Sequence, residues 1–86
     1  MVTQQVTITN PSGLHARPAS QFCRFLRKFK SKVFLVTEAG KVDCASIINL
    51  LSMAIKQGTT VKLEVTGEDE EKALPEIAEF LQNLKE

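Results

Sequence analysis

"TVKLEVTG", residues 60–67, is the clearest strand in the chain: its apolar residues alternate with charged ones. This two-residue period is typical of a strand that buries one face and exposes the other. Residues 2–9 repeat the alternation, so they predict a second strand. The β-branched and aromatic run at residues 32–36 is followed by a turn at Gly40 and then by Val42, which predicts a hairpin.

Two segments between these strands have helical spacing. The first starts at Ala16 and carries Pro18 in its first turn, where the missing N–H of a proline costs little. The second follows Ser46, a residue suited to cap a helix start. We expect this short helix to reach Ile55 and to be closed by Gly58.

A third helix follows the last strand, and acidic residues at Asp69, Glu70 and Glu71 suit its positive start. Pro75 falls beyond the first turn, so we expect either a kink or a later start. The element order is then β-α-β-β-α-β-α over residues 1–86. We predict a single α+β domain, an open-faced two-layer sandwich with three helices on one face of a four-stranded, mainly antiparallel sheet.

Charge and length exclude several classes of protein. Eleven Lys and Arg face ten Asp and Glu, a formal net charge of +1, so no global field favours nucleic acid or an anionic membrane. No stretch approaches the ~20 apolar residues that span a bilayer, and residues 1–10 lack the basic segment followed by an apolar run that is typical of a secretory signal. We expect a cytoplasmic protein with no membrane insertion.

Cys23 and Cys44 are too few for a disulfide framework, and we expect a reduced pair of small apolar residues. A single bridge between them stays open at this stage. The one histidine and these two cysteines match no metal-ligand spacing. We therefore predict no bound metal and no cofactor.

The segment "NPSGLHARPAS", residues 10–20, holds the only histidine, His15. His15 lies where a glycine-containing loop meets a helix start, and unpaired N–H groups and the helix dipole favour anions there. Arg17 can fork onto phosphate oxygens, and Ala16 and Ser12 are further candidates to contact a phosphate. An isolated histidine is more often structural, but no acidic residue precedes Glu38 to orient His15 as the base of a hydrolase.

Residues 13–19, Gly-Leu-His-Ala-Arg-Pro-Ala, resemble the active-site signature of the HPr family, the histidine phosphocarriers of the phosphoenolpyruvate-dependent sugar phosphotransferase system. The resemblance extends to residues 57–74 and to the length and element order of the chain. It implies that His15 accepts a phosphoryl group on Nδ1 from phosphorylated enzyme I and passes it to enzyme IIA domains of sugar permeases. Arg17 would stabilise that group. A carrier of this kind is not an enzyme with its own turnover, and we expect a monomer.

The resemblance also implies a second site and a docking surface. In Gram-positive relatives an ATP-dependent HPr kinase/phosphorylase modifies the serine that matches Ser46, which creates a partner for a catabolite control regulator. Asn49 and Leu51 depart from the residues usual in those relatives, so regulation and a plain helix cap both stay open. On so short a helix the apolar residues cannot all face inward. The predicted partner-docking residues are Arg24, Arg27, Ile47, Ile48 and Leu51.

Three other functions agree less well with the sequence than this carrier. The nitrogen-related phosphotransferase branch shares the histidine motif but serves regulation. A regulatory binding domain acting through Ser46 alone would not need His15 and Arg17. A nucleic-acid module is disfavoured by the near-neutral charge and by the absence of Trp and Tyr.

Overall fold

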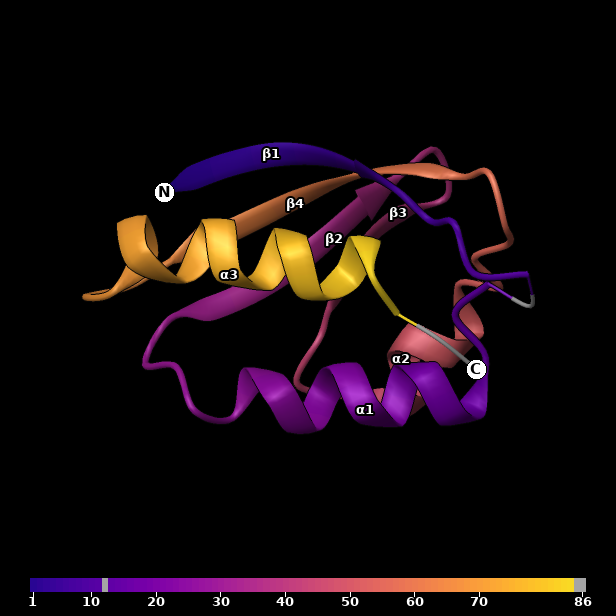
Figure 1. The fold of residues 1–86 in the computed structure, drawn as a ribbon, viewed down its shortest axis with the longest axis horizontal. Coiled ribbons are helices and arrows are strands. Elements are labelled where there is room, and N and C mark those ends of the chain that lie inside the picture. Colours follow the sequence, from indigo (N-terminus) through magenta and orange to yellow (C-terminus); the bar gives the residue numbers. More distant parts are fainter. Residues whose placement is uncertain (12, 85–86) are drawn as a thin grey trace.

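The structure is a computed structural model that describes residues 1–11 and 13–84 (Figure 1). The predicted element order is confirmed. The elements are β1 (Val2–Thr7), α1 (Ala16–Leu26), β2 (Lys32–Thr37), β3 (Gly40–Asp43), α2 (Ile47–Ser52), β4 (Thr60–Thr66) and α3 (Glu70–Gln82).

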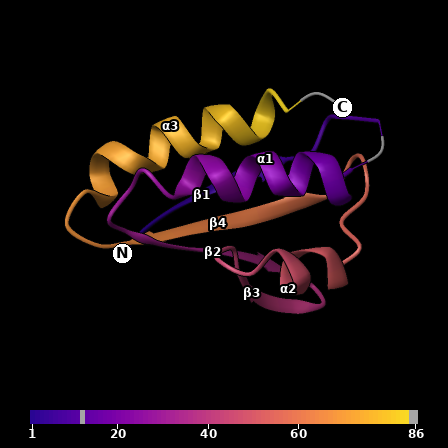
Figure 2. The same ribbon diagram turned by 90° about the horizontal axis from the view of Figure 1, so that it is seen from below.

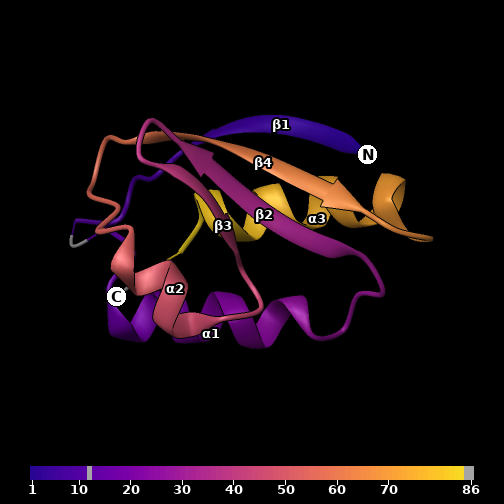
Figure 3. The same ribbon diagram turned by 180° about the vertical axis from the view of Figure 1, so that it is seen from behind.

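The strands form one antiparallel sheet in the order β1-β4-β2-β3. The stretch with the clearest alternation is the inner strand β4, which pairs with β1 from Val2↔Val65 to Thr7↔Thr60 and with β2 on its other side. The predicted hairpin of β2 and β3 closes at Thr37↔Gly40. Seen from behind, the sheet lies in front of α3 (Figure 3), and this face carries no helix. The predicted open-faced sandwich is therefore confirmed.

The core lies between the sheet and the helices, because the alternating apolar residues of each strand point to the same side. Figure 2 shows α1 and α3 side by side over that face. Phe22 is fully buried, and the ring of Phe25 stacks on Phe80 with centroids 4.1 Å apart, which joins the two helices. Burial of aromatic rings supplies much of the apolar area that holds such a layer in place.

The open face of the sheet carries charge. Glu64, on β4, forms ion pairs with Lys41 at 2.9 Å and with Lys62 at 3.3 Å, and only 7% of the residue is exposed. The hydrogen bond from Lys41 is the main cause that lowers the pKa of this carboxyl below its ordinary value. The two lysines thus cover Glu64 and keep it ionised.

Helix α2 is shorter than its sequence predicts, so the expected end near Ile55 and closure by Gly58 are wrong. The helix ends at Ser52, and Ala54 takes a positive φ of 51°, a conformation that stops a helix. Ile55 then lies outside the helix and is buried. The N–H of Gly58 instead donates to the carbonyl of Ile8 at 2.7 Å in the connection to β4.

Helix α3 begins at Glu70 and continues through Pro75, so the later start considered from the sequence is wrong. Its first turn forms regularly, because the N–H groups of Lys72 and Ala73 both donate to the carbonyl of Asp69. Pro75 and Glu71 are exposed, so the Glu71 carbonyl that loses its helical partner can be hydrated. Within the described residues, no helix has the length and apolar character to cross a membrane.

Candidate functional site

The loop that carries the histidine is fastened to the connection between α2 and β4. The N–H of Leu14 donates to the carbonyl of Ile55 at 2.9 Å, and the N–H of Gly13 donates to that of Asn10 at 3.0 Å. Gly13 has a φ of +68°, and a Cβ there would lie 2.8 Å from the Cα of Lys56 and closer still to the Ile55 carbonyl oxygen. Only glycine fits this position without backbone movement.

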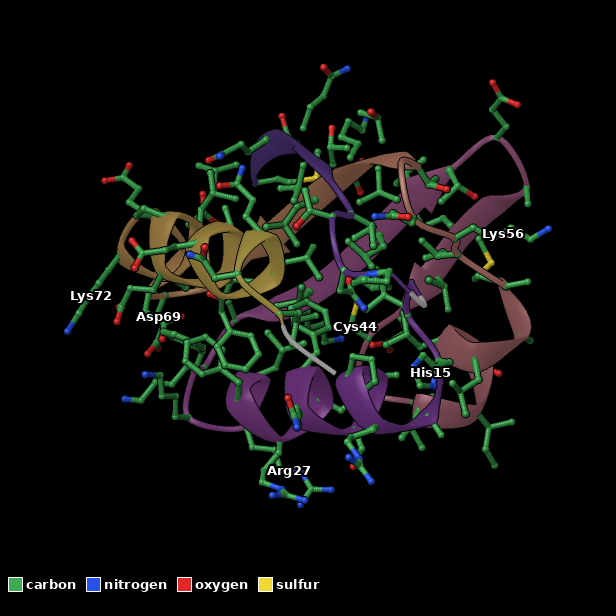
Figure 4. The ribbon with its side chains drawn as sticks, turned by 45° about the vertical axis from the view of Figure 1, so that its right-hand side comes forward. His15, Arg27, Cys44, Lys56, Asp69 and Lys72 are labelled. Atoms are coloured by element: carbon green, nitrogen blue, oxygen red, sulfur yellow. The ribbon has the colours of Figure 1, made fainter. Side chains whose placement is uncertain are left out.

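His15 is the N-cap of α1, the place predicted from the sequence. Its carbonyl accepts the first helical hydrogen bond from Ala19 at 2.9 Å, whereas its side chain makes no capping bond. The residue is exposed at the beginning of α1, close to α2 (Figure 4). The buried residues of the loop therefore hold the imidazole at the surface, and the imidazole is not part of the hydrophobic core.

The start of α1 has the character of an anion site. Ala16 and Arg17 are exposed in the first turn, and their N–H groups have no partner within the helix. Pro18 has no N–H and is buried, so it anchors the turn. His15, Ala16 and Arg17 thus lie together as predicted. Ser12, the remaining predicted phosphate contact, lies outside the described residues.

Three of the five predicted docking residues lie together where α1 meets α2. A groove of about 200 Å³ is lined by Arg24 of α1, by Arg27 at the C-cap of that helix and by Ile47 of α2. Ile48 is 76% exposed and Leu51 is half-buried. The expectation that part of this apolar set is exposed is confirmed. Arg27 points outward from α1 into solvent (Figure 4).

Ser46 is the N-cap of α2, as predicted. Its Oγ accepts a hydrogen bond from the N–H of Asn49 at 3.3 Å, and the residue is half-buried. The structural role of the side chain is therefore accounted for. A phosphate on the same oxygen would add charge at the start of a helix of six residues.

The two cysteines are free thiols, and the Sγ of Cys23 donates to the carbonyl oxygen of Cys44 at 3.0 Å. Burial raises the pKa of both thiols above the ordinary cysteine value. Throughout the described ranges, no group of three or more His, Cys, Asp or Glu side chains is placed to hold a metal ion.

The residues that support the loop before His15 were not identified from the sequence. Ile55 and Lys56 are far from His15 in the chain, and nothing in their local pattern connects them to it. Gln57 belongs to the same support, because its Nε2 donates to the carbonyl of Thr9 at 3.1 Å. The glycine at position 13 was the one signal in the sequence, because glycine permits the close approach of a neighbouring backbone.

Comparison with known proteins gives a consistent result. The family model described as the PTS HPr component phosphorylation site, where PTS denotes the phosphotransferase system, matches residues 2–83. The phosphocarrier protein HPr of Lysinibacillus sphaericus is 39% identical over 84 residues, which covers 98% of this chain and 96% of that protein. A crystal structure of HPr from Thermoanaerobacter tengcongensis has a TM-score of 0.88 at 35% identity, covering 95% of this chain and 92% of that one.

A relative with a different name is equally similar. The HPr-like protein Crh of Bacillus subtilis is 43% identical over 82 residues, or 95% of this chain and 96% of that protein. The Crh crystal structure, described as a catabolite repression protein in a swapped dimer, has a TM-score of 0.76 and covers 95% of this chain and 94% of that one.

Proposed function

The chain belongs to the HPr family of phosphocarriers, and we propose that it carries phosphoryl groups on His15 in the sugar phosphotransferase system. It accepts the group on Nδ1 of His15 from phosphorylated enzyme I and passes it to enzyme IIA domains. Arg17 and the N–H of Ala16 stabilise the phosphoryl group, with the hydroxyl of Ser12 as a further donor.

The observation that carries this proposal is the placement of His15 itself. His15 is exposed at the N-cap of α1, and Arg17 follows within the first turn. A phosphohistidine would add roughly −1.5 to −2 charges, taking phosphoserine as a guide, and each contact at an exposed helix start contributes only about 0.3 to 1 kcal/mol. Weak binding of this kind suits a phosphoryl group that must be transferred to the next protein.

Enzyme I would dock on the surface formed by Arg24, Arg27, Ile47, Ile48 and Leu51. One exposed and two half-buried apolar side chains beside two arginines suit an acidic partner with an apolar centre. We further propose that the protein acts as a cytoplasmic monomer. Sedimentation at working concentration tests the monomer directly, because a swapped dimer would double the mass.

The phosphorylation site can be tested with phosphoenolpyruvate and purified enzyme I. The wild type is expected to gain one acid-labile phosphate, and His15→Ala none. Circular dichroism checks that the variant is folded. Label that survives in a folded His15→Ala protein would move the site elsewhere in the chain, and an unlabelled wild type would overturn the proposal.

The similarity to Crh favours a second candidate, regulation through Ser46. In this reading an ATP-dependent HPr kinase/phosphorylase modifies Ser46, and the product binds a catabolite control regulator. Incubation with such a kinase and ATP should label the wild type but not Ser46→Ala. The resemblance to Gram-positive relatives also implies that a phosphate on Ser46 slows transfer at His15, so Ser46→Asp should accept phosphate from enzyme I more slowly than the wild type. An unchanged rate in Ser46→Asp would contradict this link between the two sites.

A further inference from the structure

Two thiols lie where α1 meets the connection between β3 and α2. Cys44 is fully buried between α1 and the sheet (Figure 4). Cys23 is half-buried and lines two surface grooves of about 200 and 320 Å³, the first shared with Arg24 and both shared with Arg27. One thiol is therefore accessible from solvent, and its neighbour is shielded from it.

The hydrogen bond between these residues limits the separation of their backbones. The Cys23 sulfur lies 3.0 Å from the Cys44 carbonyl oxygen. Since Sγ lies about 2.8 Å from its own Cα and a carbonyl oxygen about 2.4 Å from its own, the two Cα atoms are at most about 8 Å apart. The bends at the sulfur and at the carbonyl oxygen, where these three segments meet, shorten this distance toward the roughly 4.4–6.8 Å that a disulfide requires.

We propose that Cys23 and Cys44 form a reversible intramolecular disulfide when the protein meets a peroxide. The sulfur of Cys23 attacks one peroxide oxygen, the O–O bond breaks, and the thiol proton leaves with the other oxygen as water. The sulfur of Cys44 then attacks the resulting sulfenic acid at Cys23. An S–S bond forms, the S–O bond breaks, and the leaving hydroxide takes the Cys44 proton to give a second water. Two thiols are oxidised and one peroxide is reduced.

The surroundings assign the order of these steps. Burial raises the pKa of the Cys23 thiol, but the charge of Arg27 opposes that shift. Burial raises the pKa of the Cys44 thiol more strongly, and Cys23 adds to the effect. The half-buried thiol of Cys23, beside an arginine and open to solvent, therefore meets the oxidant first, and the buried thiol of Cys44 resolves the sulfenic acid.

The bridge would join α1 to the segment just before Ser46. Cys23 directly precedes Arg24, so oxidation would fix the two sides of the predicted docking groove relative to each other. Formation of the bridge does not depend on the proposed phosphocarrier function. It gives the chain a redox-sensitive site distinct from both His15 and Ser46.

The test treats the folded protein with hydrogen peroxide, blocks remaining thiols with iodoacetamide, and maps non-reduced peptides by mass spectrometry. The expected product is a monomer in which the Cys23 and Cys44 peptides are linked with the loss of two hydrogen atoms, and dithiothreitol restores both thiols. In Cys44→Ala, which keeps a small apolar residue in the core, sulfenic acid at Cys23 should persist and react with dimedone.

Three results would overturn the proposal. One is sulfinic acid at Cys23 while Cys44 remains a thiol in the wild type. Another is a disulfide that joins two chains. The third is a linkage that forms no faster in the folded protein than in urea, because proximity in the fold would then contribute nothing. Circular dichroism of Cys44→Ala checks that this control is folded.

Discussion

At the scale of single residues, Gly13 allows the loop before His15 to pack against the backbone of Ile55 and Lys56. Gly13→Ala should lower the free energy of unfolding by about 2–4 kcal/mol, because the new methyl group meets the backbone of Ile55 and Lys56. Urea unfolding followed by circular dichroism measures this change.

Gly58 offers a matched control. It also has a positive φ, +87°, but a Cβ there would have nothing within 4 Å. Gly58→Ala should therefore lower the free energy of unfolding only by the cost of a left-handed conformation, about 1–2 kcal/mol. If Gly13→Ala and Gly58→Ala lowered the free energy of unfolding equally, the close backbone contact at Gly13 would have no effect, which would contradict this prediction.

Arg17 is the second residue on which the site depends. Arg17→Ala should slow phosphoryl transfer from enzyme I about tenfold, the effect of losing one charge-assisted contact of about 1.4 kcal/mol. Arg17→Lys should recover part of the rate, since it restores the charge without the planar fork. Stopped-flow transfer measures both variants. Lys72→Ala, on α3 away from His15 (Figure 4), should transfer normally, and an equal loss there would point to a general charge effect.

At the scale of elements, α2 separates docking from stability. Ile48→Ala should weaken enzyme I binding, measured by calorimetry, while changing the free energy of unfolding by no more than about 0.5 kcal/mol, because Ile48 is exposed. Leu50→Ala on the same helix should cost about 2–5 kcal/mol of stability, because Leu50 is fully buried. Unchanged enzyme I affinity in Ile48→Ala would exclude this side chain from the interface.

The elements also show what the sequence predicts and what it does not. Ser46 could be assigned as a cap because its effect is local, and the alternation in residues 60–67 predicted the strand that is β4. The end of α2 could not be predicted, because Ala54 carries no sign of a positive φ. The contact of Leu14 with Ile55 joins segments that are distant in the chain, so only the folded structure brings them together.

At the scale of the whole molecule, Asp69 connects the start of α3 to the loop before β2 by hydrogen bonds. Its carboxylate accepts hydrogen bonds from the Ser31 hydroxyl and from the N–H of Lys30, which lower its pKa. A lowered pKa in the folded state means that the stabilisation is complete above the ordinary value of about 3.9 and is lost as pH falls below it. The stability gap between the wild type and Asp69→Asn should therefore shrink between pH 7 and pH 3. A constant gap in urea midpoints would contradict this assignment.

The central claim concerns the whole chain as a carrier, so the relay itself is its most direct test. Labelled phosphoenolpyruvate, enzyme I, this protein and an enzyme IIA domain are combined, and the label on each protein is followed with time. We predict that label reaches this protein first and then moves to the IIA domain, and that His15→Ala blocks both steps. A wild type that stays unlabelled, or that keeps its label while the IIA domain receives none, would contradict the account.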